Sequence, residues 1–169
     1  MMGKDKKITE EKKVFSENKE RIGRVLAVCR SEEKGTVKKD IGEGRLIEGY
    51  GLEGDAHGGN WHRQVSLLGE ESIAKMRGKG LKINYGDFAE NITTEGLVLY
   101  ELPVGTKLKI GKEAVLEVTQ IGKECHHGCE IFKKIGTCIM PREGIFARVI
   151  KGGPVKAGDR ISVLFPDYS

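Results

Sequence analysis

The chain of 169 residues lacks any run close to the roughly 20 apolar residues that a membrane-spanning helix needs. Its lysine-rich start also lacks the apolar segment of a signal peptide. No block of about five like charges occurs, and few aromatic residues lie among the basic ones, so nucleic-acid binding is not indicated. We therefore expect a cytoplasmic protein with reduced thiols and no membrane association.

One domain is expected, because 169 residues with 38% hydrophobic and 32% charged side chains can bury one proper core. The first residues are dominated by Lys and Glu, with only Ile8, Val14 and Phe15 as sizeable apolar side chains. This apolar area is too small to offset the entropy of ordering. Residues 1–21 are therefore expected to form a mobile polar tail, and residues 22–169 the domain.

Short apolar and alternating segments predict a mainly β fold with one or two short helices. A helix is expected from Glu70 to Gly78 or Gly80, with Ile73 and Met76 facing inward. A glycine turn that leads into an alternating strand occurs twice, which favours a closed or nearly closed barrel. The main expected strands lie at 22–29, 64–68, 87–96, 108–110, 114–120, 144–150 and 161–163. Within 87–96, a turn capped by Glu90 and Asn91 is the alternative.

Residues 42–60 are dense in glycine, and Gly49 to Gly54 match the dinucleotide-binding pattern G-x-G-x-x-G. That pattern works only between a strand and a helix, and no helix start follows here, so we reject this function. We interpret the segment as a long polar loop. Such loops more often serve a site than not, although idle surface histidines are the alternative. The side chains that this loop presents are Asp55, His57, His62 and Arg63.

Three of the four cysteines and two of the four histidines lie between Cys125 and Cys138. Cysteine reacts or binds metal as the thiolate, which nearby positive charge favours. Cys125 is therefore the best candidate nucleophile or metal ligand, and Cys129 would lie at the start of a helix expected over 130–135. We expect Cys138 and Cys29 to be buried. The residues beside Cys125 that favour its thiolate are Lys123, His126 and His127.

Three chemistries compete for this cluster. A structural zinc site could use Cys125, Cys129, Cys138 and one histidine, which are acceptable ligand types, but a second close ligand pair is absent. A Cys-His pair for acyl transfer is the second, although neighbours in sequence such as Cys125 and His126 generally point apart. The third is a soft thiolate that carries sulfur or binds a thiolate-loving metal.

The order of several motifs resembles that of a stand-alone MOSC domain, the module named after the C-terminal part of molybdenum-cofactor sulfurase. The similarity covers about residues 22–165. The motifs that carry it are Gly54-Asp55-Ala-His57-Gly, Arg63-Gln-Val-Ser-Leu-Leu, Phe88-Ala-Glu-Asn-Ile-Thr-Thr-Glu-Gly, Gln120 followed five residues later by Cys125, and Gly153-x-Val155-x-x-Gly158-Asp159.

The resemblance implies a MOSC-type β-barrel and a role in sulfur or molybdenum-cofactor chemistry. It implies that Cys125 carries a persulfide or ligates molybdenum, with His126 and Cys129 as further catalytic candidates. The implied cofactor is molybdopterin, whose phosphate needs cationic or amide donors. The candidate cofactor-binding residues are Asp55, His57, Arg63, Asn91, Arg142 and Arg148.

The resemblance also implies partners. A cysteine desulfurase would supply sulfur and would carry the pyridoxal phosphate, and proteins of molybdenum-cofactor biosynthesis would exchange cofactor. Three alternatives stay open: a zinc-stabilised binding module, a molybdenum-dependent reductase component, and a nucleic-acid-binding barrel.

Overall fold

A computed structural model describes residues 21–123 and 139–165. Within these ranges the chain is mainly β, as expected, with two short α-helices and one 3-10 helix, η1 (Leu99–Glu101). None of the described helices could cross a bilayer, since the longest has 8 residues. The predicted tail, the predicted helix at 130–135 and the cysteines between Cys125 and Cys138 lie outside the described residues.

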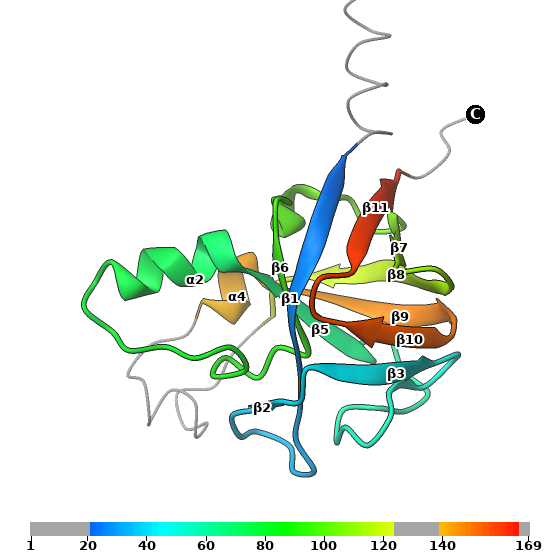
Figure 1. Ribbon diagram of the computed structural model, residues 1–169, viewed down its shortest axis with the longest axis horizontal. Helices are drawn as coiled ribbons and strands as arrows, with labels where there is room; N and C mark the ends of the chain where they lie inside the picture. The colour runs from blue at the N-terminus through cyan, green and yellow to red at the C-terminus, as the bar shows by residue number, and fades with distance from the viewer. Residues whose placement is uncertain (1–20, 124–138, 166–169) are drawn as a thin grey trace, which may run out of the picture.

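The main sheet has eight strands, and all of them except β2 close into a barrel. Closure comes from β1, which pairs with β6 on one side and with β11 on the other. All neighbours are antiparallel except β5 and β6, which are parallel and are joined through a helix. Around the barrel the strands are β1 (Ile22–Arg30), β11 (Arg160–Leu164), β7 (Lys107–Ile110), β8 (Ala114–Ile121), β9 (Ile145–Lys151), β5 (Val65–Gly69) and β6 (Ile92–Glu95), with β2 (Lys39–Asp40) beyond β1 (Figure 1).

The barrel core confirms the expected alternation. Leu108 and Ile110 of β7 are buried between exposed lysines, because successive side chains of a strand point to opposite faces. In β11, Ile161 and Val163 are buried in the same way. The central strand β8 directs inward the three side chains that the sequence predicts, Ala114, Leu116 and Val118.

A second sheet corrects the expectation that residues 42–60 form only a loop. It has three strands, in the order β10 (Gly153–Lys156), β3 (Glu43–Ile47) and β4 (Gly51–Leu52). β3 buries a single side chain, Leu46, so its sequence carries almost no hydrophobic periodicity. Rejection of the dinucleotide pattern agrees with the structure, since a tight turn and the short strand β4 occupy its place.

The two helices lie together on one side of the barrel (Figure 1). The helix α2 (Glu70–Arg77) begins and ends as predicted, with Ile73 and Met76 buried. The helix α4 (Met140–Glu143) is joined to it by Glu143, whose carboxylate accepts hydrogen bonds from Ser72 and Lys75. Together they cover a second apolar cluster outside the barrel, which includes Leu68, Phe88, Met140 and Phe146.

The strand expected over 87–96 is confirmed from Ile92 to Glu95 and wrong before it, where the alternative of a turn holds. The strand β6 begins only at Ile92, and the residues before it form a turn in which Ala89 has φ 62°. The cause is local: the side chain of Glu90 accepts a hydrogen bond from the backbone N–H of Phe88. Such bonds between a side chain and the nearby backbone compete with strand pairing.

Candidate functional site

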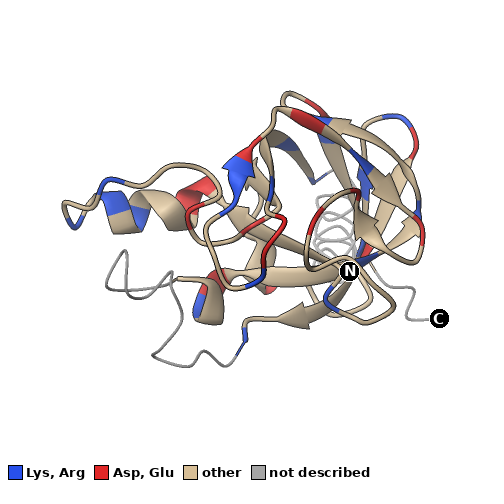
Figure 2. Ribbon diagram, turned by 90° about the horizontal axis from the view of Figure 1, so that it is seen from below, with Lys and Arg blue, Asp and Glu red and all other residues tan. Residues whose placement is uncertain are grey.

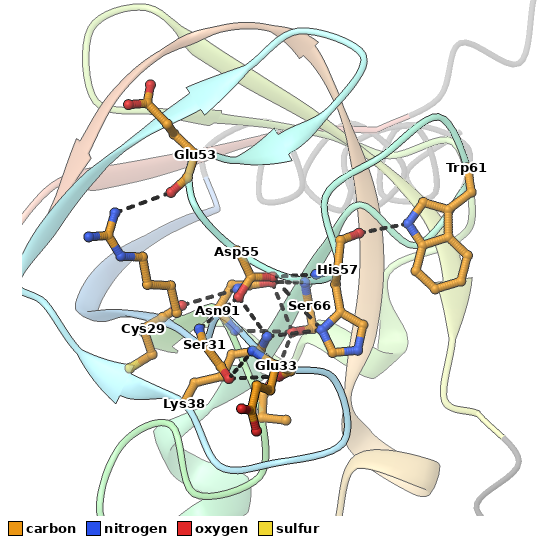
Figure 3. A network of polar contacts seen from close by, with 12 residues as sticks. Cys29, Ser31, Glu33, Lys38, Glu53, Asp55, His57, Trp61, Ser66 and Asn91 are labelled. Carbon is orange, nitrogen blue, oxygen red and sulfur yellow. Dashed lines mark hydrogen bonds and ion pairs between the residues drawn. The ribbon is translucent and has the colours of Figure 1, made fainter.

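A buried ion pair lies where the chain leaves β1. Nζ of Lys38 is 2.7 Å from Oδ1 of Asp55, and both side chains are fully buried. The backbone N–H of Ser31 donates to the same oxygen, and that of His57 donates to Oδ2 (Figure 3). Burial acts to raise the pKa of Asp55, but the hydrogen bond and charge of Lys38 outweigh it, so this pKa lies below its usual range.

His57 extends this network toward the protein surface. Its Nδ1 lies 3.0 Å from Nζ of Lys38, and its ring is stacked on that of Trp61. The indole N–H of Trp61 donates to the carbonyl oxygen of His57, which fixes the loop between them. Burial, reinforced by the charge of Lys38, lowers the pKa of His57 to about 4. The imidazole is therefore neutral at neutral pH.

Asn91 ties three strands together behind His57. Its Oδ1 accepts a hydrogen bond from the backbone N–H of Ser66 in β5, and its Nδ2 donates to the carbonyl oxygen of Cys29 in β1. Asn91 itself directly precedes β6 and is fully buried. Both ends of the amide are thus committed to the backbone, and Asn91 holds the site's walls in place.

A small pocket of about 20 Å³ opens beside His57. The apolar part of its wall is formed by Phe88, Met140 and Phe146 from the second apolar cluster. Its polar part is formed by His57, Arg63, Ser66 and Lys123, and no described carboxylate lines it. Acidic and basic residues are otherwise interspersed over the barrel (Figure 2). The pocket is therefore locally electropositive.

Arg63 is held between two aromatic rings. Its guanidinium carbon lies 4.8 Å from the ring centre of Trp61 and 5.6 Å from that of Phe146. Such stacking stabilises a guanidinium and fixes its plane. Its Nε is buried, and no described residue accepts a hydrogen bond from it. A buried donor without an acceptor is costly, so Nε of Arg63 is available to an acceptor from outside the described residues.

The floor of the pocket is strained and carries a buried acid behind it. Ala89, which lines the pocket, adopts the left-handed conformation that few residues other than glycine take. The next residue, Glu90, is fully buried, and Thr93 and the N–H of Phe88 donate to its carboxyl oxygens. Burial raises the pKa of Glu90 to about 7. Its carboxyl group does not line the pocket.

The structure brings together only some of the predicted site residues. Asp55, His57, Arg63 and Asn91 lie in one network or against one pocket. Arg142 is exposed on α4 and does not line the pocket. The catalytic candidates Cys125, His126 and Cys129 lie outside the described residues.

Arg148 points away from this pocket. It lies on the outer face of β9, with its side chain 52% exposed, and pairs with Glu117 at 3.1 Å. The buried anionic partner that an inward-facing Arg148 would need is therefore not required. Arg148 instead borders a separate surface cleft of about 440 Å³, which Trp61 and His62 also line.

Two lysines of the site were missed from the sequence. Lys38 stands in a charged segment beside Lys39 and Asp40, a pattern typical of solvated lysines. Lys123 attracted notice only as a neighbour of Cys125. Tertiary contacts decide which lysine of this charged segment is buried, so no local signal identified Lys38.

The described residues contain no cluster of three His, Cys, Asp or Glu side chains that could hold a metal ion. Cys29 is buried as predicted, and burial raises the pKa of its thiol far above the usual range. Cys29 is therefore an unreactive core residue.

A family model described as the MOSC domain matches residues 53–162. Among solved structures, the YuaD protein from Bacillus subtilis has a TM-score of 0.73 and 20% identity, over 86% of this chain and 97% of that one. YiiM from Escherichia coli has a TM-score of 0.60 and 21% identity, over 86% of this chain and 72% of that one. For YiiM from Geobacillus stearothermophilus the TM-score is 0.58 and the identity 15%, over 86% and 74%. The likeness to these structures is one of fold.

A search of curated proteins found no match to this chain.

Proposed function

Since this chain belongs to the MOSC domain family, we propose that it handles molybdenum cofactor, or sulfur bound for that cofactor, through Cys125. The family is associated with molybdenum-cofactor chemistry, and the site's electropositive pocket suits an anionic cofactor. In this proposal Cys125 carries a persulfide or ligates molybdenum. His126 and Cys129 are its nearest candidate helpers in sequence.

The observation that carries the proposal is the position of Lys123. This lysine lines the pocket, and Cys125 follows it by two residues. Cys125 itself lies outside the described residues, so what supports the proposal is its place in the sequence beside a lysine of the pocket. Met140, which follows Cys138 by two residues, lines the same pocket. Cations near a thiol favour the thiolate, which is the form that carries sulfur or binds metal.

The described residues offer cations to an anionic group at the mouth of the pocket, whose volume of about 20 Å³ admits about one water-sized group. Arg63 offers a buried Nε donor without an acceptor, and Lys123 adds a second cation. Such donors bind phosphate with charge-assisted hydrogen bonds. When bound, the cofactor supplies a metal on a dithiolene, which can take up sulfur or exchange electrons. The residues of this chain would hold the phosphate of the cofactor. No described carboxylate lines the pocket to repel that phosphate.

For the sulfur-carrier form of the function, a partner cysteine desulfurase would supply the sulfur. The thiolate of Cys125 would attack the outer sulfur of the donor's persulfide, and the donor's thiolate would leave. This exchange needs no oxidant or reductant. Pyridoxal phosphate would belong to the desulfurase. The thiolate of Cys129 would then attack Sγ of Cys125, which forms a disulfide between the two residues and releases the outer sulfur as hydrosulfide.

The function is tested by purifying the full chain without oxygen, with and without a cysteine desulfurase and cysteine. Native mass spectrometry would detect persulfide or cofactor, and elemental analysis would read molybdenum, tungsten and zinc together. We expect either a persulfide or stoichiometric molybdenum or tungsten in the wild type and in Cys29→Ala. Cys125→Ala should carry neither. Zinc alone, removed by a chelator with loss of fold, would support the zinc-stabilised module instead.

A matched pair of arginine variants tests the cofactor site. Arg63→Gln should retain no more than about one tenth of the cofactor that the wild type retains, because a hydrogen bond to a charged group is lost. Arg148→Gln should retain as much as the wild type, since Arg148 is exposed and pairs with Glu117. If the two variants retained equal amounts of cofactor, the pocket beside Arg63 would not be the cofactor-binding site.

A further inference from the structure

We propose that Lys38 is a positioning residue that holds His57 as a neutral imidazole with its proton on Nε2, so that His57 serves the pocket as a hydrogen-bond donor to an anion. The protonation state can be measured in the free protein and does not depend on the proposed function. The ligand that this donor would serve, an anionic phosphate or oxyanion group, does rest on it.

The direction of the hydrogen bond between Lys38 and His57 follows from the donors available. Nζ of Lys38 lies 2.7 Å from Oδ1 of Asp55 and 3.0 Å from Nδ1 of His57 (Figure 3). Burial lowers the pKa of Lys38, but the hydrogen bond and charge of the ionised Asp55 act against this and favour the ammonium form. An ammonium group has three donors and no acceptor. The first contact is therefore Lys38 donating to the carboxylate, and the second is Lys38 donating to Nδ1. An Nδ1 that accepts a hydrogen bond carries no proton.

Asp55 does not compete for a proton on Nδ1. Its Oδ2 lies 3.8 Å from Nδ1 of His57, too far for a hydrogen bond. That oxygen instead accepts the backbone N–H of His57 at 3.1 Å. The other oxygen, Oδ1, accepts from Lys38 and from the N–H of Ser31. The carboxylate is thus committed to Lys38 and to two backbone donors.

The charges around the ring disfavour its doubly protonated form. Among the largest influences on the ring, the charges of Lys38, Lys123 and Lys34 lower its pKa, and that of Asp55 raises it. Desolvation acts in the same direction as the cations and lowers the pKa of His57. With Nδ1 occupied and the ring neutral, the single proton is on Nε2.

In this state the polar wall of the pocket offers hydrogen-bond donors. His57, Arg63 and Lys123 line it, and all three then offer N–H groups. No described lining side chain offers a carboxylate, and the hydroxyl of Ser66 already donates to the carbonyl oxygen of Ala89. Such a wall suits an anionic oxygen at the pocket, whose volume of about 20 Å³ admits about one water-sized group. It also means that His57 neither takes a proton from a substrate nor ligates a metal through Nε2.

The first test needs only the wild-type chain labelled with ¹⁵N at histidine. Long-range ¹H–¹⁵N spectra distinguish the two ring nitrogens, and the His57→Gln variant identifies the resonances of His57. We expect the proton on Nε2 at neutral pH and no protonation of Nδ1 above about pH 5. A proton on Nδ1, or a doubly protonated ring at neutral pH, would overturn the proposal.

The second test asks whether Lys38 causes this state. In Lys38→Met the donor to Nδ1 is gone and Asp55 is left without its cation. His57 should then carry a proton on Nδ1 toward Asp55 and titrate closer to the usual histidine pKa. Lys38→Arg, which keeps a donor and a charge, should retain the wild-type tautomer. A folded Lys38→Met that keeps Nε2 protonation and the wild-type titration would show that Lys38 does not set the tautomer.

The third test follows the resonance of His57 Nε2–H during titration with inorganic phosphate. The wild type should show a saturable shift, and Lys38→Arg should behave similarly. His57→Gln, followed through the backbone N–H of Arg63, should bind phosphate about tenfold more weakly. No response of His57 to phosphate would overturn its role as a donor to anions. That outcome would leave the sulfur and metal chemistry of Cys125 to its own experiment.

Discussion

The ammonium of Lys38 and the carboxylate of Asp55 form a 2.7 Å ion pair with both side chains fully buried. Removing one partner of such a pair leaves an uncompensated charge, which is far more costly than losing the attraction itself. We expect Lys38→Met or Asp55→Asn to lower the free energy of unfolding by about 3–5 kcal/mol. Urea unfolding of each variant measures this.

The double variant Lys38→Met with Asp55→Leu should lose much less than the sum of the two single losses, because no buried charge then remains. The exposed pair of Arg148 and Glu117 is the matched control. Its removal should change the free energy of unfolding by less than about 1 kcal/mol. Strict additivity at Lys38 and Asp55 would mean that the two groups do not interact as their geometry indicates.

Glu90 should make the protein less stable as the pH rises. Burial raises its pKa in the folded protein from 4.5 to about 7. Between these values the folded protein holds a proton that the unfolded chain has lost, so the free energy of unfolding falls as pH increases through this window. From about pH 5 to pH 8 this group alone should account for a fall on the order of 2 kcal/mol.

Glu90→Gln imitates the protonated acid and should remove that fall. Its curve of unfolding free energy against pH, from urea titrations, should therefore be flatter than that of the wild type. The exposed Glu53→Gln is the control and should keep the wild-type curve. A Glu90→Gln curve parallel to the wild type would indicate that Glu90 is ionised in the folded protein throughout.

Gly86 should tolerate no side chain. Its φ is +93°, and a Cβ there would lie 2.2 Å from the carbonyl oxygen of Lys38. Gly86→Ala should therefore cost about 3 kcal/mol, because it adds a backbone clash to an unfavourable conformation. Gly80 has a similar φ of +88° with nothing within 4 Å. Gly80→Ala should cost only about 1 kcal/mol, and a similar cost for both would contradict the close contact.

Arg63 should contribute more to ligand binding than to stability. Its stacking on Trp61 and Phe146 is favourable, but its buried Nε has no acceptor among the described residues. These terms oppose each other, so Arg63→Met should change the free energy of unfolding by less than about 1 kcal/mol. Cofactor retention should nevertheless fall. A large loss of stability would show that Arg63 is structural.

Much of the fold could be predicted because its signals are local. The alternation in β7, β8 and β11 reads directly as one buried and one exposed face. The helix α2 carries acidic residues in its first turn and a glycine after its last. The predictions that were wrong also have local causes. β3 buries only Leu46, and the turn before β6 depends on the side chain of Glu90 rather than on hydrophobic pattern.

The site was predicted in part, for a different reason. Asp55, His57 and Arg63 stood out because chemically active side chains gathered in one glycine-rich stretch. Lys38 did not, since its partner Asp55 is 17 residues away and only the folded chain brings them together. Arg148 was predicted as a cation for the cofactor, but the strand directs it outward to Glu117. The register of a strand in the barrel decides whether a given side chain points into the barrel or out of it.

The paired strands β1 and β11, which close the barrel, hold the ends of the domain far from its pocket. Ile22 pairs with Ser162, so the first and last strands lie side by side, while Cys29 and Ser31, at the other end of β1, lie in the network that contains His57. β1 has 9 residues, and it therefore holds these two regions about 25 Å apart. Residues 22 and 165 could be joined by a short linker, and new termini opened elsewhere on the barrel, without disturbing the walls of the pocket.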